Sequence, residues 1–114
     1  MIKNITKNAL LSQNIKHCSS FFSKCKGLMF SKKLTDNALL FHFPSEKRHS
    51  LHMLFVFYPI DVLWLNQNRK VVEMKQSFKP FTFATPKKPA KFIIELPENT
   101  IKNSKTEIGD SVEF

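Results

Sequence analysis

The side chains best suited to chemistry lie inside the most apolar stretch of the chain, residues 51–65. His52 stands near the start of this stretch, and Asp61 follows Pro59 in its second half. A histidine held by a carboxylate can serve as a base, a ligand or a structural bridge. Because burying either group without a partner costs free energy, we expect both to be anchored by polar contacts. A structural network is the simplest expectation, and a binding site or an active site is the alternative.

Lys26 and Glu95 are the other two candidate ligand contacts or polar anchors. Lys26, beside Gly27, and His42, on an expected neighbouring strand, are candidate partners for this histidine and aspartate. Glu95 lies within an apolar segment, where an ion pair with a lysine on the adjoining strand is the simplest way to accommodate its charge. The complete candidate set is Lys26, His52, Asp61 and Glu95.

Other forms of chemistry lack the residues that they need. No nucleophile stands in a recognisable setting, since Cys18 and Cys25 share one face of a predicted helix, where we interpret both as reduced core thiols. The spacing of His42, His49 and His52 matches no zinc pattern. Only two glycines are present, too few for a phosphate-binding loop. The sequence therefore predicts no catalytic residue, no metal site and no cofactor.

The charge balance favours contact with a polyanion. The chain carries 18 Lys plus Arg against 9 Asp plus Glu, a formal net charge of +9. Such an excess attracts nucleic acid without sequence preference. The alternative is a solvated, lysine-rich surface, because nearly all of the positive charge is lysine and this composition also fits a coding bias.

Aromatic and basic residues interleave in the segment 76–90, which has the composition of surfaces that bind single-stranded nucleic acid. Its candidate polyanion contacts are Lys79, Lys87 and Lys88. The competing interpretation is that the aromatic rings close one end of a barrel. The rings in question are Phe78, Phe81 and Phe83.

Many short strands must position these residues. Leu39, Phe41 and Phe43 alternate with Leu40 and His42, which predicts a strand that ends at Pro44. Residues 91–96 are predicted to form another strand, which ends at Pro97. Residues 51–57 are almost wholly apolar, as in a central strand covered on both faces.

The remaining elements fit the same fold class. They are one or two short strands in 1–17, a helical stripe near 19–30, a hairpin of 62–65 with 70–75, and a last strand after Gly109-Asp110. Many short strands with frequent turns are typical of an antiparallel sandwich or barrel. The sequence therefore predicts a single mostly β domain over residues 1–114, jelly-roll-like, with one short helix near residues 19–30.

Three fragments, taken in this order and spacing, resemble one protein family. They are the segments 26–30, 52–62 and 93–97, the last followed by Ile108-Gly109-Asp110. They are similar to "domain of unknown function 192", a conserved group in bacteria and archaea, and the His-Met-Leu-Phe run at His52 looks like the archaeal form. Glu98 and Asn99 stand where the family commonly has a glycine after this strand. The resemblance implies a small β-sandwich or jelly-roll-type barrel, and it assigns no activity.

Two functions remain open from the sequence. The first is a non-enzymatic binding or accessory module whose partner is nucleic acid or another polyanion. The alternative is a small-ligand-binding protein or an enzyme that uses His52 and Asp61 in a pocket at one end of the barrel. Neither a signal peptide nor a membrane span is evident, so we expect a cytoplasmic protein that is a monomer or a weak oligomer.

Overall fold

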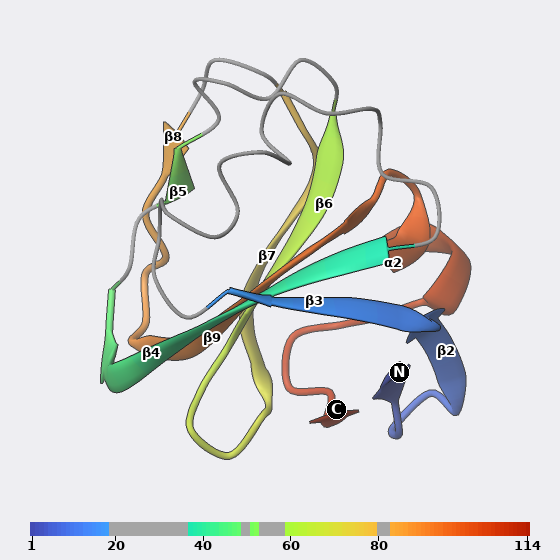
Figure 1. The fold of residues 1–114 in the computed structure, drawn as a ribbon, viewed down its shortest axis with the longest axis horizontal. Coiled ribbons are helices and arrows are strands. Elements are labelled where there is room, and N and C mark those ends of the chain that lie inside the picture. The colour runs from blue at the N-terminus through green and yellow to red at the C-terminus, as the bar shows by residue number, and fades with distance from the viewer. Residues whose placement is uncertain (19–36, 49–50, 53–58, 80–82) are drawn as a thin grey trace.

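Strands account for most of the residues that the computed structural model describes, which are 1–18, 37–48, 51–52, 59–79 and 83–114 (Figure 1). The strands are β1 (Ile2–Asn4), β2 (Ala9–Ser12), β3 (Asn14–Cys18), β4 (Asn37–Lys47), β5 (Leu51–His52), β6 (Ile60–Leu65), β7 (Val71–Phe78), β8 (Phe83–Ala84), β9 (Ala90–Pro97) and β10 (Val112–Glu113). The described helix is α2 (Thr100–Ser104). The chain is therefore mostly β, as the sequence predicts.

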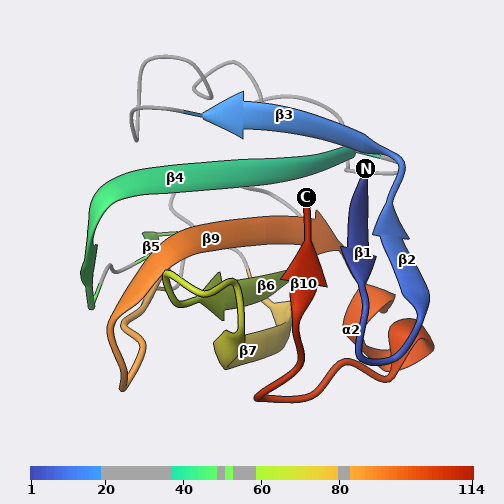
Figure 2. The same cartoon turned by 90° about the horizontal axis from the view of Figure 1, so that it is seen from below.

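The described strands form three sheets. The largest has the order β3-β4-β9-β6-β7, in which β3 and β4 are parallel and the other neighbours are antiparallel. A second sheet has the order β10-β1-β2, and β5 pairs with β8 in a third. The β10-β1-β2 sheet stands across one face of the five-stranded sheet (Figure 2). The five-stranded sheet is open, with β3 and β7 at its edges, so the described residues form a sandwich-like fold and no closed barrel.

Cross-strand register divides the five-stranded sheet into two faces, which we call the first face and the second face. The first face packs against the small sheet and α2, and it carries Leu40, Leu63, Leu65, Phe92, Ile94 and Leu96. The second face carries Leu39, Phe41, Val62, Trp64, Ile93 and Glu95. Both faces are buried, which is why all six residues of β6 are buried although side chains alternate along a strand.

The predicted hairpin is confirmed as β6 and β7. Its turn is held by Asn66, whose side-chain oxygen accepts the backbone N–H groups of Asn68 and Lys70 at 2.9 and 3.0 Å. Arg69 takes the left-handed conformation that such a turn requires, with φ of 60°. The strand over 91–96 and the last strand are confirmed too, as β9 and β10.

One predicted strand boundary was wrong, and another falls largely outside the described residues. Strand β4 continues past Pro44 to Lys47. The register of β4 with β9 shifts between His42 and Lys47, and Pro44 lies in this irregular part. The N–H that proline lacks is therefore not needed for a hydrogen bond between the two strands. The predicted central strand begins as β5, which pairs only with β8, and residues 53–58 lie outside the described part of the chain. Among the described strands, β9 is the central strand of the large sheet.

The helical elements also differ from expectation. The helix predicted near residues 19–30 lies outside the described residues, apart from Cys18, which belongs to strand β3. Helix α2 was not predicted, because its sequence, Thr-Ile-Lys-Asn-Ser, has too few apolar residues to show a helical period. Over the ranges described here, no helix has the length and apolar character needed to cross a membrane.

Candidate functional site

Asp61 is a buried anchor between three elements. It lies on β6 opposite a bulge in β7, because Ile60 pairs with Phe78 and Val62 with Lys75, which leaves two residues of β7 facing one of β6. Ser77 in this bulge has a φ of 50°, and its freed backbone N–H donates to Asp61 Oδ1 at 3.0 Å.

The other oxygen of Asp61 caps α2. Asn99 precedes this helix and makes no side-chain capping bond, yet the backbone N–H of Ile101 donates to Asp61 Oδ2 at 2.8 Å. Asp61 thereby satisfies one of the amides that a helix start leaves open. Asp61 is 1% exposed, and both of its carboxylate oxygens accept hydrogen bonds from backbone amides. This geometry indicates a structural role.

Of the three candidate partners of Asp61, only His42 has a side chain within the described part of the chain. His42 is exposed and stacks on Phe92, with ring centroids 4.9 Å apart. His52 lies on β5 opposite Phe83 in the β5–β8 pair, and its side chain is outside the described part of the chain. Lys26 also lies outside the described residues.

Glu95 lies at the centre of the second face. Its neighbours across β9 are Leu39 on β4 and Val62 on β6, so the residues directly opposite it are apolar and neither is the lysine that we expected. Burial raises the pKa of the Glu95 carboxyl from 4.5 to about 7. A carboxyl group that is about half protonated near neutral pH therefore lies between two apolar neighbours, Leu39 and Val62.

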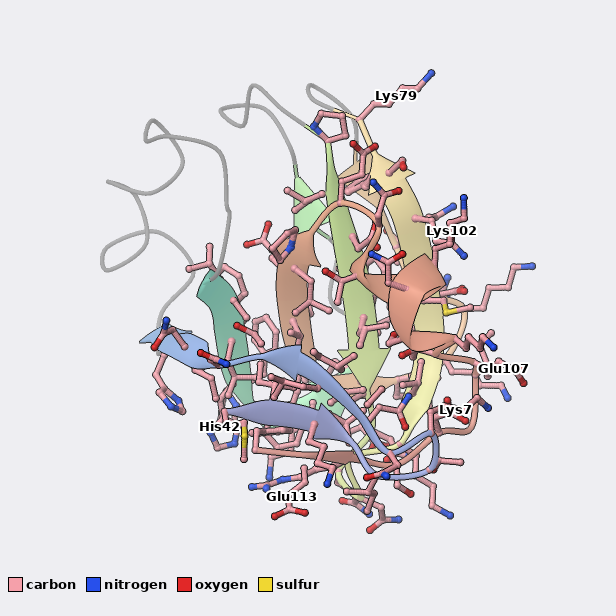
Figure 3. All side chains as sticks on the ribbon, turned by 90° about the vertical axis from the view of Figure 1, so that its right-hand side faces the viewer. Lys7, His42, Lys79, Lys102, Glu107 and Glu113 are labelled. Atoms are coloured by element: carbon pink, nitrogen blue, oxygen red, sulfur yellow. The ribbon has the colours of Figure 1, made fainter. Side chains whose placement is uncertain are left out.

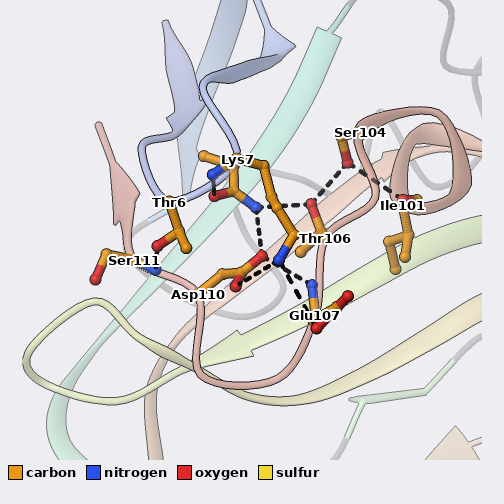
Figure 4. Close-up of polar contacts among 9 residues, drawn as sticks. Thr6, Lys7, Ile101, Ser104, Thr106, Glu107, Asp110 and Ser111 are labelled. Carbon is orange, nitrogen blue, oxygen red and sulfur yellow. Dashed lines mark hydrogen bonds and ion pairs between the residues drawn. The ribbon is translucent and has the colours of Figure 1, made fainter.

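A third buried carboxylate, Asp110, joins the two ends of the chain. Asp110 accepts hydrogen bonds from Asn4 Nδ2 at 2.9 Å, from the Glu107 backbone N–H at 2.9 Å and from Lys7 Nζ at 3.3 Å (Figure 4). Asn4 is fully buried and also donates to Thr106 Oγ1 at 3.0 Å. These contacts fasten β1 to the segment that follows α2, so Asp110 does more than form the turn that we expected.

The hydrogen bonds around Asp110 lower the pKa of its carboxyl group. Burial alone would raise the pKa of this carboxyl, but hydrogen bonds from Asn4, Glu107 and Lys7, together with the charge of Lys7, hold it below its ordinary value of 3.8. A lowered carboxyl pKa stabilises the fold above pH 3.8, and that stabilisation is lost as the pH falls through the folded-state pKa.

We expect Asp110→Asn to lower the free energy of unfolding at pH 7 by about 1–2 kcal/mol, because the amide loses the charge-assisted bonds and keeps one acceptor. Urea denaturation at pH 7 and pH 3 measures this. The loss should shrink at pH 3, because this pH lies below the ordinary pKa of 3.8 and the advantage of the ionised folded carboxyl is smaller there. An unchanged midpoint at pH 7 would show that the network contributes nothing to stability.

Four cations gather at the end of the sheet where β4 stops and β9 begins, which we call the basic end (Figure 1). Lys47 on β4 pairs with Ala90, the first residue of β9. Arg48 Nε donates to the carbonyl oxygen of Pro86 at 2.9 Å, which ties the segment before β9 to the end of β4. The basic end consists of Lys47, Arg48, Lys87 and Lys88, and all four side chains are exposed.

The charges of the basic end are not neutralised by the residues that the structure describes. Lys7 is paired with Glu107 and Asp110, and the Arg69 guanidinium lies 4.0 Å over the Phe114 ring. By contrast, no ion pair within the described ranges involves the four cations of the basic end. The nearby acid, Glu46, turns toward the β6–β7 turn, where it accepts the backbone N–H of Gln67 at 2.8 Å.

The third predicted lysine lies elsewhere. Lys79 directly follows Phe78, which pairs with Ile60 of β6. Ile60 in turn pairs with Pro97 at the far end of β9. Ala90 and Pro97 are seven residues apart on β9, which is roughly 23 Å in an extended strand. Figure 3 shows Lys79 at the top of the molecule, on the side where Lys102 of α2 also lies. The structure therefore brings together Lys87 and Lys88 but not Lys79.

Sequence reasoning missed Lys47 and Arg48 as candidate contacts. The available signal was the charged run Glu46-Lys47-Arg48, which looked like a solvated loop. Only the register of β4 with β9 shows that this run adjoins Lys87 and Lys88.

A groove of about 500 Å³ lies between β2 and the start of α2. Its lining is mostly polar, with Glu98 as its charged residue, and neither Asp61, Glu95 nor the basic end contributes to it. In the part of the chain that the structure describes, no three His, Cys, Asp or Glu side chains lie close enough to hold a metal ion.

Comparison with known proteins gives consistent matches over the whole chain. A family model described as DUF192, uncharacterized ACR, matches residues 2–114. A UPF0127 protein of Thermococcus sibiricus is 38% identical over 116 residues, which cover 100% of this chain and 74% of that protein. A UPF0127 protein of Pyrococcus furiosus is 37% identical over 113 residues, which cover 97% of this chain and 95% of that protein.

A solved structure shares the fold. The crystal structure of a protein of unknown function from Novosphingobium aromaticivorans superposes with a TM-score of 0.85 at 18% identity, covering 99% of this chain and 81% of that chain. At this identity the likeness concerns the fold alone.

Proposed function

This chain belongs to the DUF192 family, and we propose that it is a non-enzymatic binding module for a polyanion, with a nucleic-acid strand as the partner. The observation that carries the proposal is the basic end. Four exposed cations from two chain segments meet there, and the described residues supply no acid to neutralise them.

The physical basis is the release of counterions. A cation that contacts a phosphate displaces a condensed counterion, so binding weakens with salt by about 0.7 logarithmic units per contact and decade of salt for single strands. Four contacts correspond to a slope of about −3 and to nonspecific dissociation constants of roughly 10⁻⁴ to 10⁻⁶ M. The Arg48 bond to Pro86 supports a binding role, because it fixes the two segments relative to each other before a ligand arrives.

The geometry of Asp61 argues against the alternative function. An enzyme or small-ligand site built on His52 and Asp61 needs the aspartate to be accessible. Both of its oxygens accept backbone amides at the junction of β6, β7 and α2. A carboxylate whose two oxygens are held in this way is better suited to stabilising the fold than to catalysing a reaction.

Charge reversal at the basic end tests the proposal. We expect Lys87→Glu with Lys88→Glu to weaken binding of a labelled single-stranded RNA by at least about tenfold at low salt, because two attractive contacts become repulsive. Fluorescence anisotropy measures the affinity.

The matched control is Lys102→Glu with Lys105→Glu, on and directly after α2 at the other end of β9. Each double variant changes the net charge by the same four units, two per substitution, from +9 to +5. The control should lose less than about threefold, and so should Lys79→Glu. Equal losses in both double variants would mean that overall charge, rather than the basic end, attracts the RNA. Absence of binding by the wild type at low salt contradicts the proposal outright.

A further inference from the structure

His42 is an exposed ring whose position is fixed by other rings beneath it. Its imidazole lies on the Phe92 ring, with the centroids 4.9 Å apart and an angle of 22° between the ring planes. Phe114 packs edge-on against Phe92 at 5.0 Å, and the Arg69 guanidinium lies 4.0 Å over Phe114 and 5.6 Å over Phe92. Phe92 is 6% exposed, whereas His42 is exposed. Because Phe92 covers one side of the imidazole, the stack presents its other side to solvent.

The exposed imidazole lies on the same face of the sheet as the strand residue of the basic end. His42 pairs with Phe92 and Lys47 pairs with Ala90, so the two β4 residues stand opposite β9 residues that are two apart. Residues two apart on a strand share a face and are separated by about 7 Å. Figure 3 shows His42 at the surface below β4, at the other end of the view from Lys79. An exposed ring and exposed cations therefore lie side by side.

These two features correspond to the two parts of a nucleotide. Cations attract the phosphate, and a flat ring stacks on the base, whatever the base is, because every base has a π face. A duplex keeps the faces of its bases inside its own stack, so only an unpaired base can lie on a protein ring. The imidazole is already held against Phe92, so it loses less side-chain freedom on binding than an unsupported ring would.

We propose that His42 is the base-stacking residue of the site at the basic end, so that the module prefers nucleic acid with unpaired bases to a duplex. The inference rests on the proposed function, because a base reaches His42 only when the basic end holds the adjoining phosphates. It goes further, since counterion release alone does not distinguish nucleic acid from another polyanion. The site then recognises phosphate through Lys47 and its neighbours and a base through His42.

The test compares three probes that share phosphate and differ in their bases: a short oligouridylate, an RNA duplex of the same length and inorganic polyphosphate. We expect the wild type to bind the oligouridylate at least about fivefold more tightly than the duplex, although the duplex has the higher density of charge. His42→Ala should weaken binding of the oligouridylate at least about fivefold and leave binding of the other two probes unchanged, because neither offers a base face. Fluorescence anisotropy measures the labelled RNAs, and calorimetry measures polyphosphate.

Two variants and one spectroscopic measurement make the result specific. His42→Phe keeps a ring that carries no charge and should bind the oligouridylate within about twofold of the wild type. Gln76→Ala, exposed on β7 at the opposite edge of the five-stranded sheet from β3 and β4, should leave binding unchanged. In NMR spectra of the wild type, the oligouridylate should shift the ring-proton resonances of His42, because a stacked base adds its ring current, and polyphosphate should shift them far less.

Failure of this inference and failure of the binding function give different results. Base stacking is excluded if wild type and His42→Ala bind the oligouridylate equally, or if His42→Phe binds as weakly as His42→Ala, while polyphosphate binding persists. The same holds if the wild type binds the duplex as tightly as the oligouridylate. Loss of polyphosphate binding by His42→Ala would assign His42 to the fold and overturn its role as a stacking residue. A wild type that binds none of the three probes at low salt would overturn the binding function and this inference with it.

Discussion

Replacing Glu95 with glutamine raises the free energy of unfolding at pH 8 by roughly 3 kcal/mol, an expected stabilisation by a single substitution in the core. The folded-state pKa of about 7 lies above the ordinary 4.5, so the folded protein holds a proton that the unfolded chain has lost. Stability therefore falls as the pH rises from about 4.5 to about 7 and stays at the lower level above that. Glutamine has no charge to bury, so the variant escapes this loss.

The comparison that isolates the effect is urea denaturation of both proteins at pH 5 and pH 8. The difference between Glu95→Gln and the wild type should be about 1 kcal/mol at pH 5 and near its full size at pH 8. Glu98→Gln, on a partly exposed carboxylate, should change stability by less than about 0.5 kcal/mol at both values. A wild type whose stability does not fall between pH 5 and pH 8 would show that the Glu95 charge is compensated within the fold.

Replacing Asp61 with alanine should cost about 3–5 kcal/mol, the largest destabilisation that we expect from one polar residue. The substitution removes both acceptors, so the N–H of Ser77 in the bulge and the N–H of Ile101 in α2 lose their partners. Each bond to a charged acceptor contributes about 1.5–3 kcal/mol. Asn at this position keeps one acceptor and should cost less, about 2 kcal/mol.

Urea denaturation followed by circular dichroism measures the Asp61 series. Glu113→Ala, on an exposed carboxylate of β10, serves as the reference and should change stability by less than about 0.5 kcal/mol. A loss below about 1 kcal/mol in Asp61→Ala would mean that water replaces the carboxylate at both amides, and the structural assignment would then be wrong.

The sequence predicted the parts of the fold that depend on local pattern. Its fold class, a mostly β sandwich-like structure, is confirmed, and so is its family. Strands β6, β7 and β9 follow from apolar residues bounded by a turn or a proline. The end of β4 was wrong because a proline terminates a strand only where its N–H is needed, and that depends on the register with β9.

The parts that could not be predicted depend on contacts far apart in the chain. Asp110 reaches Asn4 across 106 residues, and Asp61 reaches Ile101 across 40, so no local pattern shows either network. The basic end could not be predicted for the same reason, because its two segments meet through the pairing of Lys47 with Ala90 and the hydrogen bond from Arg48 to Pro86. Among the candidate residues, the described geometry separates a structural aspartate, Asp61, from a carboxylate without a partner, Glu95.

The most direct test of the binding function is the salt dependence of single-stranded RNA binding by the wild type and the two double lysine variants. We expect the logarithm of the association constant to fall with the logarithm of salt concentration at a slope of about −3 in the wild type. Lys87→Glu with Lys88→Glu should flatten the slope by about 1.4, the share of two phosphate contacts, whereas Lys102→Glu with Lys105→Glu should keep it. The same slope in all three proteins, or flattening by both double variants alike, would contradict a phosphate-binding site at the basic end.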